Sequence, residues 1–298
     1  MSKPEAMAYK MQPAGHEAPQ LKRKYPEPDR HLENALKEWS RHSSIWGVQN
    51  LAYDSFQSKY KKAEELVKPL DISIDQAYGL ILKYQDSENP DISDAGIFLT
   101  ALYNNSPEKI FTFDLEIEKL DHLGCMLATG KTLIINCKKT NAIGKYSAGN
   151  IVNFASADMM AQSSSGLAIN YGNVGDQGFA WQSRGTAINY GTVKDDFGAT
   201  SKGCIIDFGK CKYVGSFATG HVIGNSKTRF VDVKNAKVVR LNPSVKTEFN
   251  SYILDLKKRF SYDGNIQKIV EEIHKLGPMP AQKIPDDLDA ILRRSKNA

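Results

Sequence analysis

Three aspartates are the residues in this chain whose type and spacing most directly suggest chemistry. Asp176 and Asp195 fall at the same place in two successive sequence repeats, and Asp196 follows directly. Three carboxylates on one edge would suit a hard cation such as Ca²⁺, and a pair of carboxylates would suit an enzyme that cleaves glycans. Aspartate in a turn, however, more often bonds its own backbone. The three residues are therefore candidates for a metal site or a catalytic set, with a structural turn as the alternative.

A second set of polar residues recurs with the same spacing. Asn153, Asn170, Asn189 and Asp207 occupy one position in four consecutive repeats. Stacked amides can hydrogen-bond from one repeat to the next and so fix the register of a repeat protein. The same row could instead present identical donors and acceptors to a partner. We expect the structural role and keep the four residues as binding candidates.

The remaining chemical motifs do not form a recognisable set. The cysteines are Cys125, Cys137, Cys204 and Cys211, and their spacing includes no C-x-x-C pair or zinc-finger pattern. The segment Gly172–Gly178 lacks the Lys-Ser/Thr of a phosphate-binding loop. The serines at 163–165 lack the Gly-x-Ser-x-Gly form of a nucleophile elbow. We therefore predict no cofactor and favour a non-enzymatic function, while the question of catalysis stays open.

A glycine-bounded repeat must position these residues. It reads GLAINYG at 166–172, GTAINYG at 185–191 and GCIIDFG at 203–209. Copies aligned on their first glycine begin at Gly130, Gly149, Gly166, Gly185, Gly203 and Gly220, which gives steps of 17 to 19 residues. A short β-type run recurring at such a period is typical of a solenoid.

The repeat also predicts which side chains fill the interior. The third residue after each glycine is aliphatic, and the fifth is usually aromatic. These are Leu133, Val152, Ile169, Ile188, Ile206 and Ile223 at position three, and Ile135, Phe154, Tyr171, Tyr190 and Phe208 at position five. Because alternate residues of a strand share a face, we expect both rows to point inward. A second run that carries Phe179, Phe197 and Phe217 predicts a second strand in each coil.

The sequence outside the repeat divides into three parts. Residues 1–30 are rich in Pro, Lys and Glu and predict a flexible arm, and residues 31–108 have the apolar period of helices. The repeat and its extensions span 109–242. Residues 243–298 contain amphipathic stretches at 246–259, 265–276 and 286–293, which we expect to cap the solenoid. The predicted class is thus α+β, a right-handed parallel β-solenoid of about six coils flanked by N- and C-terminal helices.

The glycine pattern resembles a known family. The phrase Gly185–Gly191, followed by FGATSKG at 197–203, is similar to the glycine-rich right-handed β-helix domain at the C-terminus of glutamate synthases, which also occurs in a subunit of formylmethanofuran dehydrogenase. It is also similar to uncharacterised archaeal repeat proteins. The resemblance covers about residues 130–226 and implies a spacer that positions other domains. It implies no catalytic residue in this chain.

The apolar runs and the charge of the chain narrow the range of possible locations and functions. No apolar run approaches the roughly 20 residues of a membrane span, and the N-terminus lacks a secretory signal, so we expect a cytoplasmic protein without membrane contact. Basic residues outnumber acidic ones in the repeat, and the net charge is +5. We predict a scaffold or interaction module with a protein partner, and self-association as a further expectation. The alternatives are an enzyme subunit acting on carbohydrate or amide chemistry and a nucleic-acid binder with a basic surface.

Overall fold

The computed structural model describes residues 29–45, 53–71, 73–85, 95–113, 120–137, 139–176, 178–182, 185–224, 228–233 and 235–240. Most of the predicted arm at 1–30 lies outside these residues, as do all of the predicted C-terminal helices at 243–298.

Four helices precede the solenoid, close to where the apolar period predicts them. They are α1 (Arg30–Ile45), α2 (Tyr53–Val67), α3 (Ile74–Gln85) and α4 (Ala95–Asn105). Ser73 caps α3, because its Oγ accepts a 3.3 Å hydrogen bond from the Gln76 amide, while the Gln76 side chain accepts a 3.0 Å bond from the Ser73 amide. This reciprocal pair satisfies two amides that a bare helix end would leave without partners. None of α1 to α4 is both long and apolar enough to span a bilayer.

The described strands form two parallel sheets. In order across the first sheet they are β1 (Ile110–Phe113), β2 (Thr132–Ile135), β4 (Asn150–Asn153), β6 (Leu167–Asn170), β8 (Thr186–Asn189), β10 (Cys204–Asp207), β12 (His221–Gly224) and β13 (Lys237–Arg240). In order across the second sheet they are β11 (Lys210–Val214), β9 (Thr192–Phe197), β7 (Asn173–Val174), β5 (Ser156–Met160) and β3 (Lys139–Ile143).

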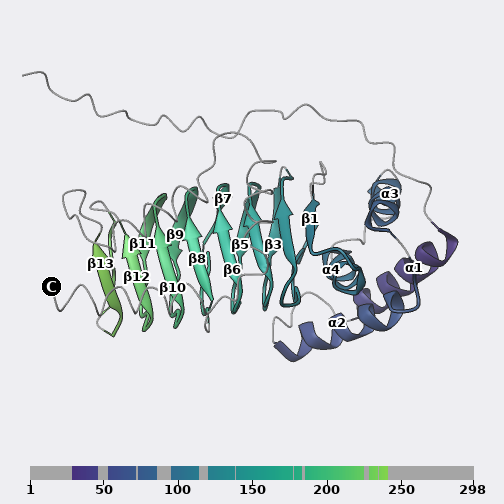
Figure 1. Cartoon of the computed structure of the whole chain (residues 1–298), viewed down its shortest axis with the longest axis horizontal. Helices are drawn as coiled ribbons and strands as arrows, with labels where there is room; N and C mark the ends of the chain where they lie inside the picture. The colour runs from purple at the N-terminus through teal and green to yellow at the C-terminus, as the bar shows by residue number, and fades with distance from the viewer. Residues whose placement is uncertain are drawn as a thin grey trace, which may run out of the picture.

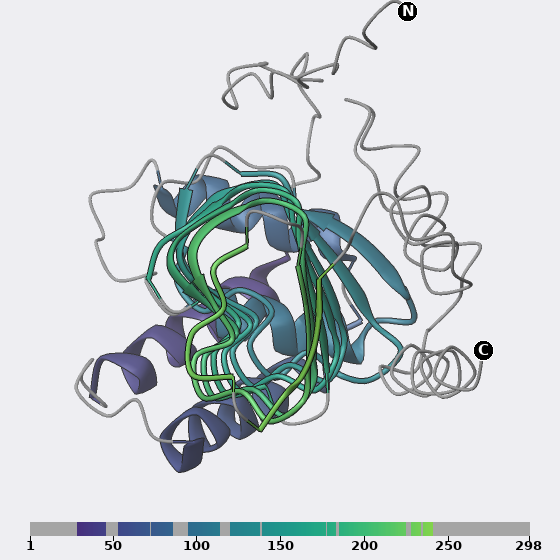
Figure 2. The same cartoon turned by 90° about the vertical axis from the view of Figure 1, so that its left-hand side faces the viewer.

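The two sheets are sides of one stack of coils. Most coils contribute one strand to each sheet and close through a turn on a third side. Strands of successive coils lie side by side along the rod in Figure 1, and the coils lie over one another in the end-on view of Figure 2. The prediction of a parallel β-solenoid of about six coils, with helices beside it, is confirmed.

The structure corrects the alignment of the first repeat by one residue. Leu133 pairs with Ile151 of the next coil, one residue away from the pairing that alignment on Gly130 predicts. Ile134 therefore joins the aliphatic row, and Ile135 joins the row of the asparagines. Gly130 misleads because it serves a turn, with φ at +82° in the region that favours glycine.

The predicted direction of the rows is also wrong. Positions two and four face the interior, since a Cβ added to Gly144 or Gly198 would collide with Ile151 or Ile205, both at position two. Positions three and five lie on the opposite side of the first sheet, which we call the outer face. Its residues are Ile134, Val152, Ile169, Ile188, Ile206 and Ile223 at position three, and Phe154, Tyr171, Tyr190 and Phe208 at position five. The inference failed because both faces of these strands are buried, so apolar character does not mark the inner one.

The phenylalanine run does not mark the second strand. That strand begins only a few residues after the first one ends, as in β9 after β8. Phe197 ends β9, whereas Phe179 and Phe217 lie in the turns of the third side, both with positive φ. The three phenylalanines therefore occupy different rows of the solenoid, and only Phe179 and Phe197 belong to the core.

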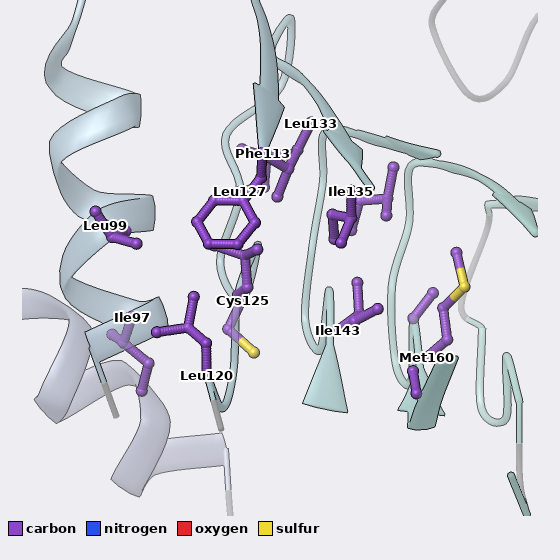
Figure 3. Close-up of a cluster of buried hydrophobic side chains, with 14 of the residues drawn as sticks. Ile97, Leu99, Phe113, Leu120, Cys125, Leu127, Leu133, Ile135, Ile143 and Met160 are labelled. Atoms are coloured by element: carbon purple, nitrogen blue, oxygen red, sulfur yellow. The ribbon is translucent and has the colours of Figure 1, made fainter. Parts of the chain in front are cut away.

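One hydrophobic core runs from the helices into the coils. Helix α4 is buried along most of its length and closes the N-terminal end of the stack. Figure 3 shows its Ile97 and Leu99 facing Leu127 and other residues of the first coils. The contact is close, because a Cβ on Gly96 would collide with the backbone carbonyl of Asp121. Trp39 of α1 lies in the same core, as expected for an aromatic at helical spacing.

Candidate functional site

Two of the three predicted aspartates, Asp176 and Asp195, are exposed and pair with lysines on the second sheet. Asp176 Oδ1 is 3.4 Å from Nζ of Lys194, and Asp195 Oδ1 is 3.5 Å from Nζ of Lys212. Each lysine belongs to the coil after its aspartate, so the pairs repeat along the rod. Exposed pairs of this kind contribute little to stability, about 0 to 1 kcal/mol. The lysines neutralise the carboxylate charge that would otherwise attract a metal cation.

The third aspartate has a different environment. Burial raises the pKa of Asp196, hydrogen bonds from Ser216 lower it in part, and the neighbouring charge of Asp195 raises it again. Within the described part of the chain, no three His, Cys, Asp or Glu side chains gather as a metal-binding group. The structure therefore brings Asp195 and Asp196 near each other without assembling the predicted metal-ligand set.

The asparagine row is an internal hydrogen-bonded ladder. The Nδ2 of Asn153 donates to Oδ1 of Asn170 at 3.0 Å, Asn170 donates in the same way to Asn189 at 3.0 Å, and Asn189 donates to Asp207 at 2.9 Å. The three asparagine side chains are 0% exposed. Asn153 and Asn170 also bond the backbone two residues later in both directions. The ladder has no face free for a partner in this arrangement, which favours the structural role.

The ladder ends in a carboxylate for a physical reason. Position four of the next coil is Gly224, which offers no acceptor to a further amide. Where the asparagines have an amide NH₂ donor, Asp207 has a second acceptor oxygen. This oxygen accepts hydrogen bonds from the Cys211 thiol and the Thr228 hydroxyl, both at 3.4 Å. Burial, and then the Asp207 carboxylate, raise the pKa of Cys211. A thiol that resists ionisation is a poor nucleophile, so Cys211 serves the corner of the coil.

The third side of the solenoid has a backbone conformation that is rare for residues other than glycine. Two rows of residues there have φ between +50° and +80°, the left-handed region. The first row is Gly124, Gly144, Ala161, Phe179, Gly198 and Gly215. The second row, two residues later, is Met126, Tyr146, Ser163, Trp181, Thr200 and Phe217. Amides of the second row bond to the following coil, as from Trp181 to the Ala199 carbonyl at 2.8 Å, so the rows stack in register.

The second row places aromatic side chains on every second coil. Tyr146, Trp181 and Phe217 alternate with Ser163 and Thr200. Trp181 is 50% exposed and Phe217 is 65% exposed, which makes them the two largest apolar side chains that the described solenoid presents to solvent. Since neighbouring coils are about 4.8 Å apart, successive aromatics of this row stand about 10 Å apart.

The N-terminal end of this row is completed by helix α2. Tyr53 of α2 is 48% exposed and meets Tyr146 edge to face, with ring centroids 4.9 Å apart. Next to this pair, the Nζ of Lys145 lies 4.8 Å from the centroid of the Phe56 ring and 5.3 Å from the centroid of the Tyr146 ring. Burial lowers the pKa of Lys145. We call Tyr53, Tyr146, Trp181 and Phe217 the aromatic edge.

Phe217 of the aromatic edge carries a conformational cost that its own packing does not repay. A left-handed backbone costs a residue with a Cβ about 1 to 2 kcal/mol, and bulky residues are uncommon there. Phe179, at φ +62°, is fully buried and so contributes to the core in return. Phe217, at φ +57°, is mostly exposed. Strain of this kind at an exposed side chain is a reason to look for a function.

The comparisons with known proteins give no independent assignment. No family model, no curated protein and no solved structure matches the chain. The resemblance to the glutamate synthase domain therefore gains no support from them and remains a prediction. The site has to be judged on its geometry.

Sequence reasoning missed the aromatic edge because its members are not aligned by the glycines. The number of residues between the first glycine of a repeat and this turn varies from coil to coil. Alignment on the first glycine therefore groups Phe217 with Phe179 and Phe197, although it lies in another row. A usable signal was present: in several coils the second row follows a glycine or alanine by two residues, as Tyr146 follows Gly144. This signal separates Phe217, which follows Gly215, from Phe179 and Phe197, but it does not find Trp181, which follows Phe179.

Proposed function

We propose that this chain is a non-catalytic binding module in which a stiff solenoid displays the aromatic edge to a partner. The observation that carries the proposal is the pair Trp181 and Phe217, which are exposed although their backbone conformation disfavours large side chains. Aromatic residues dominate the energetics of interfaces because they bury a large area with few rotatable bonds. A rod whose coils bond to each other on all three sides holds them at fixed spacing.

Binding is favoured over catalysis by the state of the polar groups. Asp176 and Asp195 are paired with lysines, and the asparagine ladder is buried and internally bonded. The Cys211 thiol is held in its neutral form by burial. The role as an enzyme subunit for carbohydrate or amide chemistry keeps Asp196 as its best candidate, without a second described group that would complete an acid and base pair.

The partner that this edge suits best is a protein, and a direct test uses a photo-crosslinking residue. We would place p-benzoylphenylalanine at position 217 and, as a matched control on the second sheet, at exposed Thr192. Irradiation in the source cells should yield a defined adduct from position 217 and none from position 192. Trp181→Ala should remove the adduct, because it takes away the neighbouring aromatic. Equal adducts from both positions, or none from 217, would contradict the proposal, and an adduct with a second copy would identify self-association.

A second candidate ligand follows from the spacing of the edge. Aromatics about 10 Å apart on every second coil match the disaccharide repeat of an extended β-1,4-linked glycan, whose alternate rings turn the same face outward. Titration with cellohexaose should then change the fluorescence of Trp181, and Trp181→Ala should abolish binding in calorimetry while Thr192→Ala leaves it intact. An absence of binding heat at millimolar sugar would exclude this ligand without touching the protein partner.

Nucleic-acid binding is less well supported by the charges. The described lysines on the second sheet, such as Lys194 and Lys212, alternate with the aspartates that they pair with. A phosphate backbone needs a groove with an excess of positive charge. Affinity that fell steeply with salt would restore this alternative. The spacer role that the glutamate synthase resemblance implies agrees with a module that presents one edge and catalyses nothing.

A further inference from the structure

The three solenoid rings of the aromatic edge form a straight and evenly spaced row. Tyr146, Trp181 and Phe217 share a φ of +57° to +58°, and the amide bonds of this turn keep successive coils in register. The coils lie over one another in the end-on view of Figure 2. Each ring is two coils from the next, so at about 4.8 Å per coil the row repeats every ~9.6 Å. A binding partner therefore meets a periodic surface and not a single aromatic patch.

The positions between the rings carry small side chains with hydroxyl groups. Ser163 lies between Tyr146 and Trp181, and Thr200 lies between Trp181 and Phe217. Trp181 is 50% exposed and Phe217 is 65% exposed, so both rings stand clear of these small neighbours. The row is thus a series of ridges and notches, and each notch is about one coil wide.

We propose that the aromatic edge binds a proline-rich segment of a partner protein in the polyproline II conformation. The inference rests on the proposed function and names the chemistry of the partner. A polyproline II helix has three residues per turn and rises about 3.1 Å per residue, so each of its faces repeats every ~9.3 Å. Over the two intervals from Tyr146 to Phe217 this repeat differs from that of the edge by only about 0.6 Å.

Other backbone conformations match the row less well. Two turns of an α-helix rise about 10.8 Å, so a helix would be about 2.4 Å out of register at the third ring. Alternate residues of an extended strand are about 6.8 Å apart, so a strand would miss the second ring by about 2.8 Å. The polyproline repeat is the one of the three that places a side chain at every ring.

The polar groups of the edge suit the same segment. A polyproline II backbone has no internal hydrogen bonds, so its carbonyl groups need donors from outside. The indole N–H of Trp181 and the hydroxyl of Tyr53 belong to side chains that are about half exposed, and the Ser163 hydroxyl lies between them along the row. Lys202 is exposed and follows Thr200 by two residues, so an acidic residue beside the prolines would meet an opposite charge.

A peptide of twelve prolines is the probe for this assignment. We would titrate the full-length protein into the fluorescein-labelled peptide and follow fluorescence anisotropy, with a glycine-serine peptide of the same length as the control ligand. We expect saturable binding of the proline peptide alone. Trp181→Ala and Phe217→Ala should each weaken it about tenfold or more, because each removes one ring of the row. Thr192→Ala, on the second sheet, should leave the affinity unchanged.

An exchange of two side chains tests the spacing of the rings apart from their presence. Trp181→Thr combined with Thr200→Trp keeps the same side chains in the same row but moves one ring by one coil. The rings then stand about 14 Å and about 5 Å apart, and the proline peptide should bind as weakly as it does to Trp181→Ala. Wild-type affinity in the exchange variant, or no saturable binding to the wild type at millimolar peptide, would overturn the proposal.

The photo-crosslink from position 217 distinguishes a failure of this inference from a failure of the proposed function. A defined protein adduct in cells without binding of the proline peptide would refute the polyproline assignment and leave the binding module standing. Binding of cellohexaose in place of the peptide would assign the row to a glycan and would also refute it. Absence of both the adduct and the peptide binding would refute the two proposals together.

Discussion

Replacement of Asn170 by alanine tests the asparagine ladder at its centre. The side chain makes four hydrogen bonds: it donates to Asn189 Oδ1 at 3.0 Å and to the Gly172 carbonyl at 3.1 Å, and it accepts from Asn153 Nδ2 at 3.0 Å and from the Gly172 amide at 3.1 Å. It is fully buried, so water cannot replace these partners without entering the corner of the coil.

The magnitude follows from which groups lose their partners. The Gly172 amide also donates to the Asn153 carbonyl, and the Gly172 carbonyl also accepts from the Thr192 amide. Asn189 Oδ1 and one Asn153 amide hydrogen, by contrast, lose the bonds that they make to Asn170. A buried polar group without its partner costs about 1 to 3 kcal/mol. We therefore expect Asn170→Ala to lower the free energy of unfolding by about 3 kcal/mol.

Equilibrium unfolding in urea, followed by circular dichroism, measures this change. Asn173→Ala is the matched control, because Asn173 is an exposed asparagine of the same coil, and it should change stability by less than about 0.5 kcal/mol. If Asn170→Ala were as mild as Asn173→Ala, the ladder would not fix the register. A mild effect on stability together with a loss of partner binding would revive the role of the row as a binding surface.

Three further changes test other parts of the structure. Burial raises the pKa of Tyr171 and of Tyr190, so the unfolded state ionises first and stability should fall as pH rises above about 10; a pH titration of unfolding shows this, and Tyr171→Phe should reduce the slope. Because burial also raises the pKa of Asp196, the ionised carboxylate is disfavoured in the folded state. Asp196→Asn should thus stabilise the protein slightly at pH 7, with the advantage vanishing at acidic pH where the carboxyl is already neutral, and a destabilised variant would contradict this reasoning. Gly96→Ala would drive a methyl group into the Asp121 carbonyl and should lower the melting temperature by several degrees, whereas an unchanged value would mean that α4 is not seated closely on the first coil.

Sequence reasoning reached the architecture because the repeat constrains it strongly. A glycine at 166, 185 and 203 leaves room for the backbone of the neighbouring coil, since a Cβ on Gly185 or Gly203 would collide with the carbonyl of the coil before it. Such close approach recurs once per coil, so the period is visible in the sequence. The number of coils, the parallel pairing and the N-terminal helices followed from that period and from ordinary helix signals.

The inward direction of the strands was not predictable in the same way. Ala168 and Ile169 are adjacent, and both are buried, one inside the coil and one on the outer face. Alternation reveals a direction only where one face is solvated. The buried position of Asn170 misled further, because an amide is accepted inside a solenoid only when the neighbouring coils supply its partners, and those partners are not adjacent in sequence.

The aromatic edge escaped prediction for a related reason. Its three solenoid residues share a backbone conformation, not a sequence motif: Tyr146, Trp181 and Phe217 have φ between +57° and +58°. Nothing in the composition of a single repeat marks a tryptophan as left-handed. The lesson for repeat proteins of this kind is that each turn needs its own alignment, apart from that of the strands.

The most direct test of the central claim compares two phenylalanines that share a left-handed backbone but differ in burial. Phe217→Gly relieves the left-handed strain and gives up only partial burial, so the free energy of unfolding should stay within about 1 kcal/mol of wild type. Phe179→Gly removes a fully buried ring at φ +62° and should cost about 3 kcal/mol or more. If Phe217→Gly destabilised the protein as much as Phe179→Gly, the aromatic edge would be part of the folding core and the proposal that it is kept for a partner would fail.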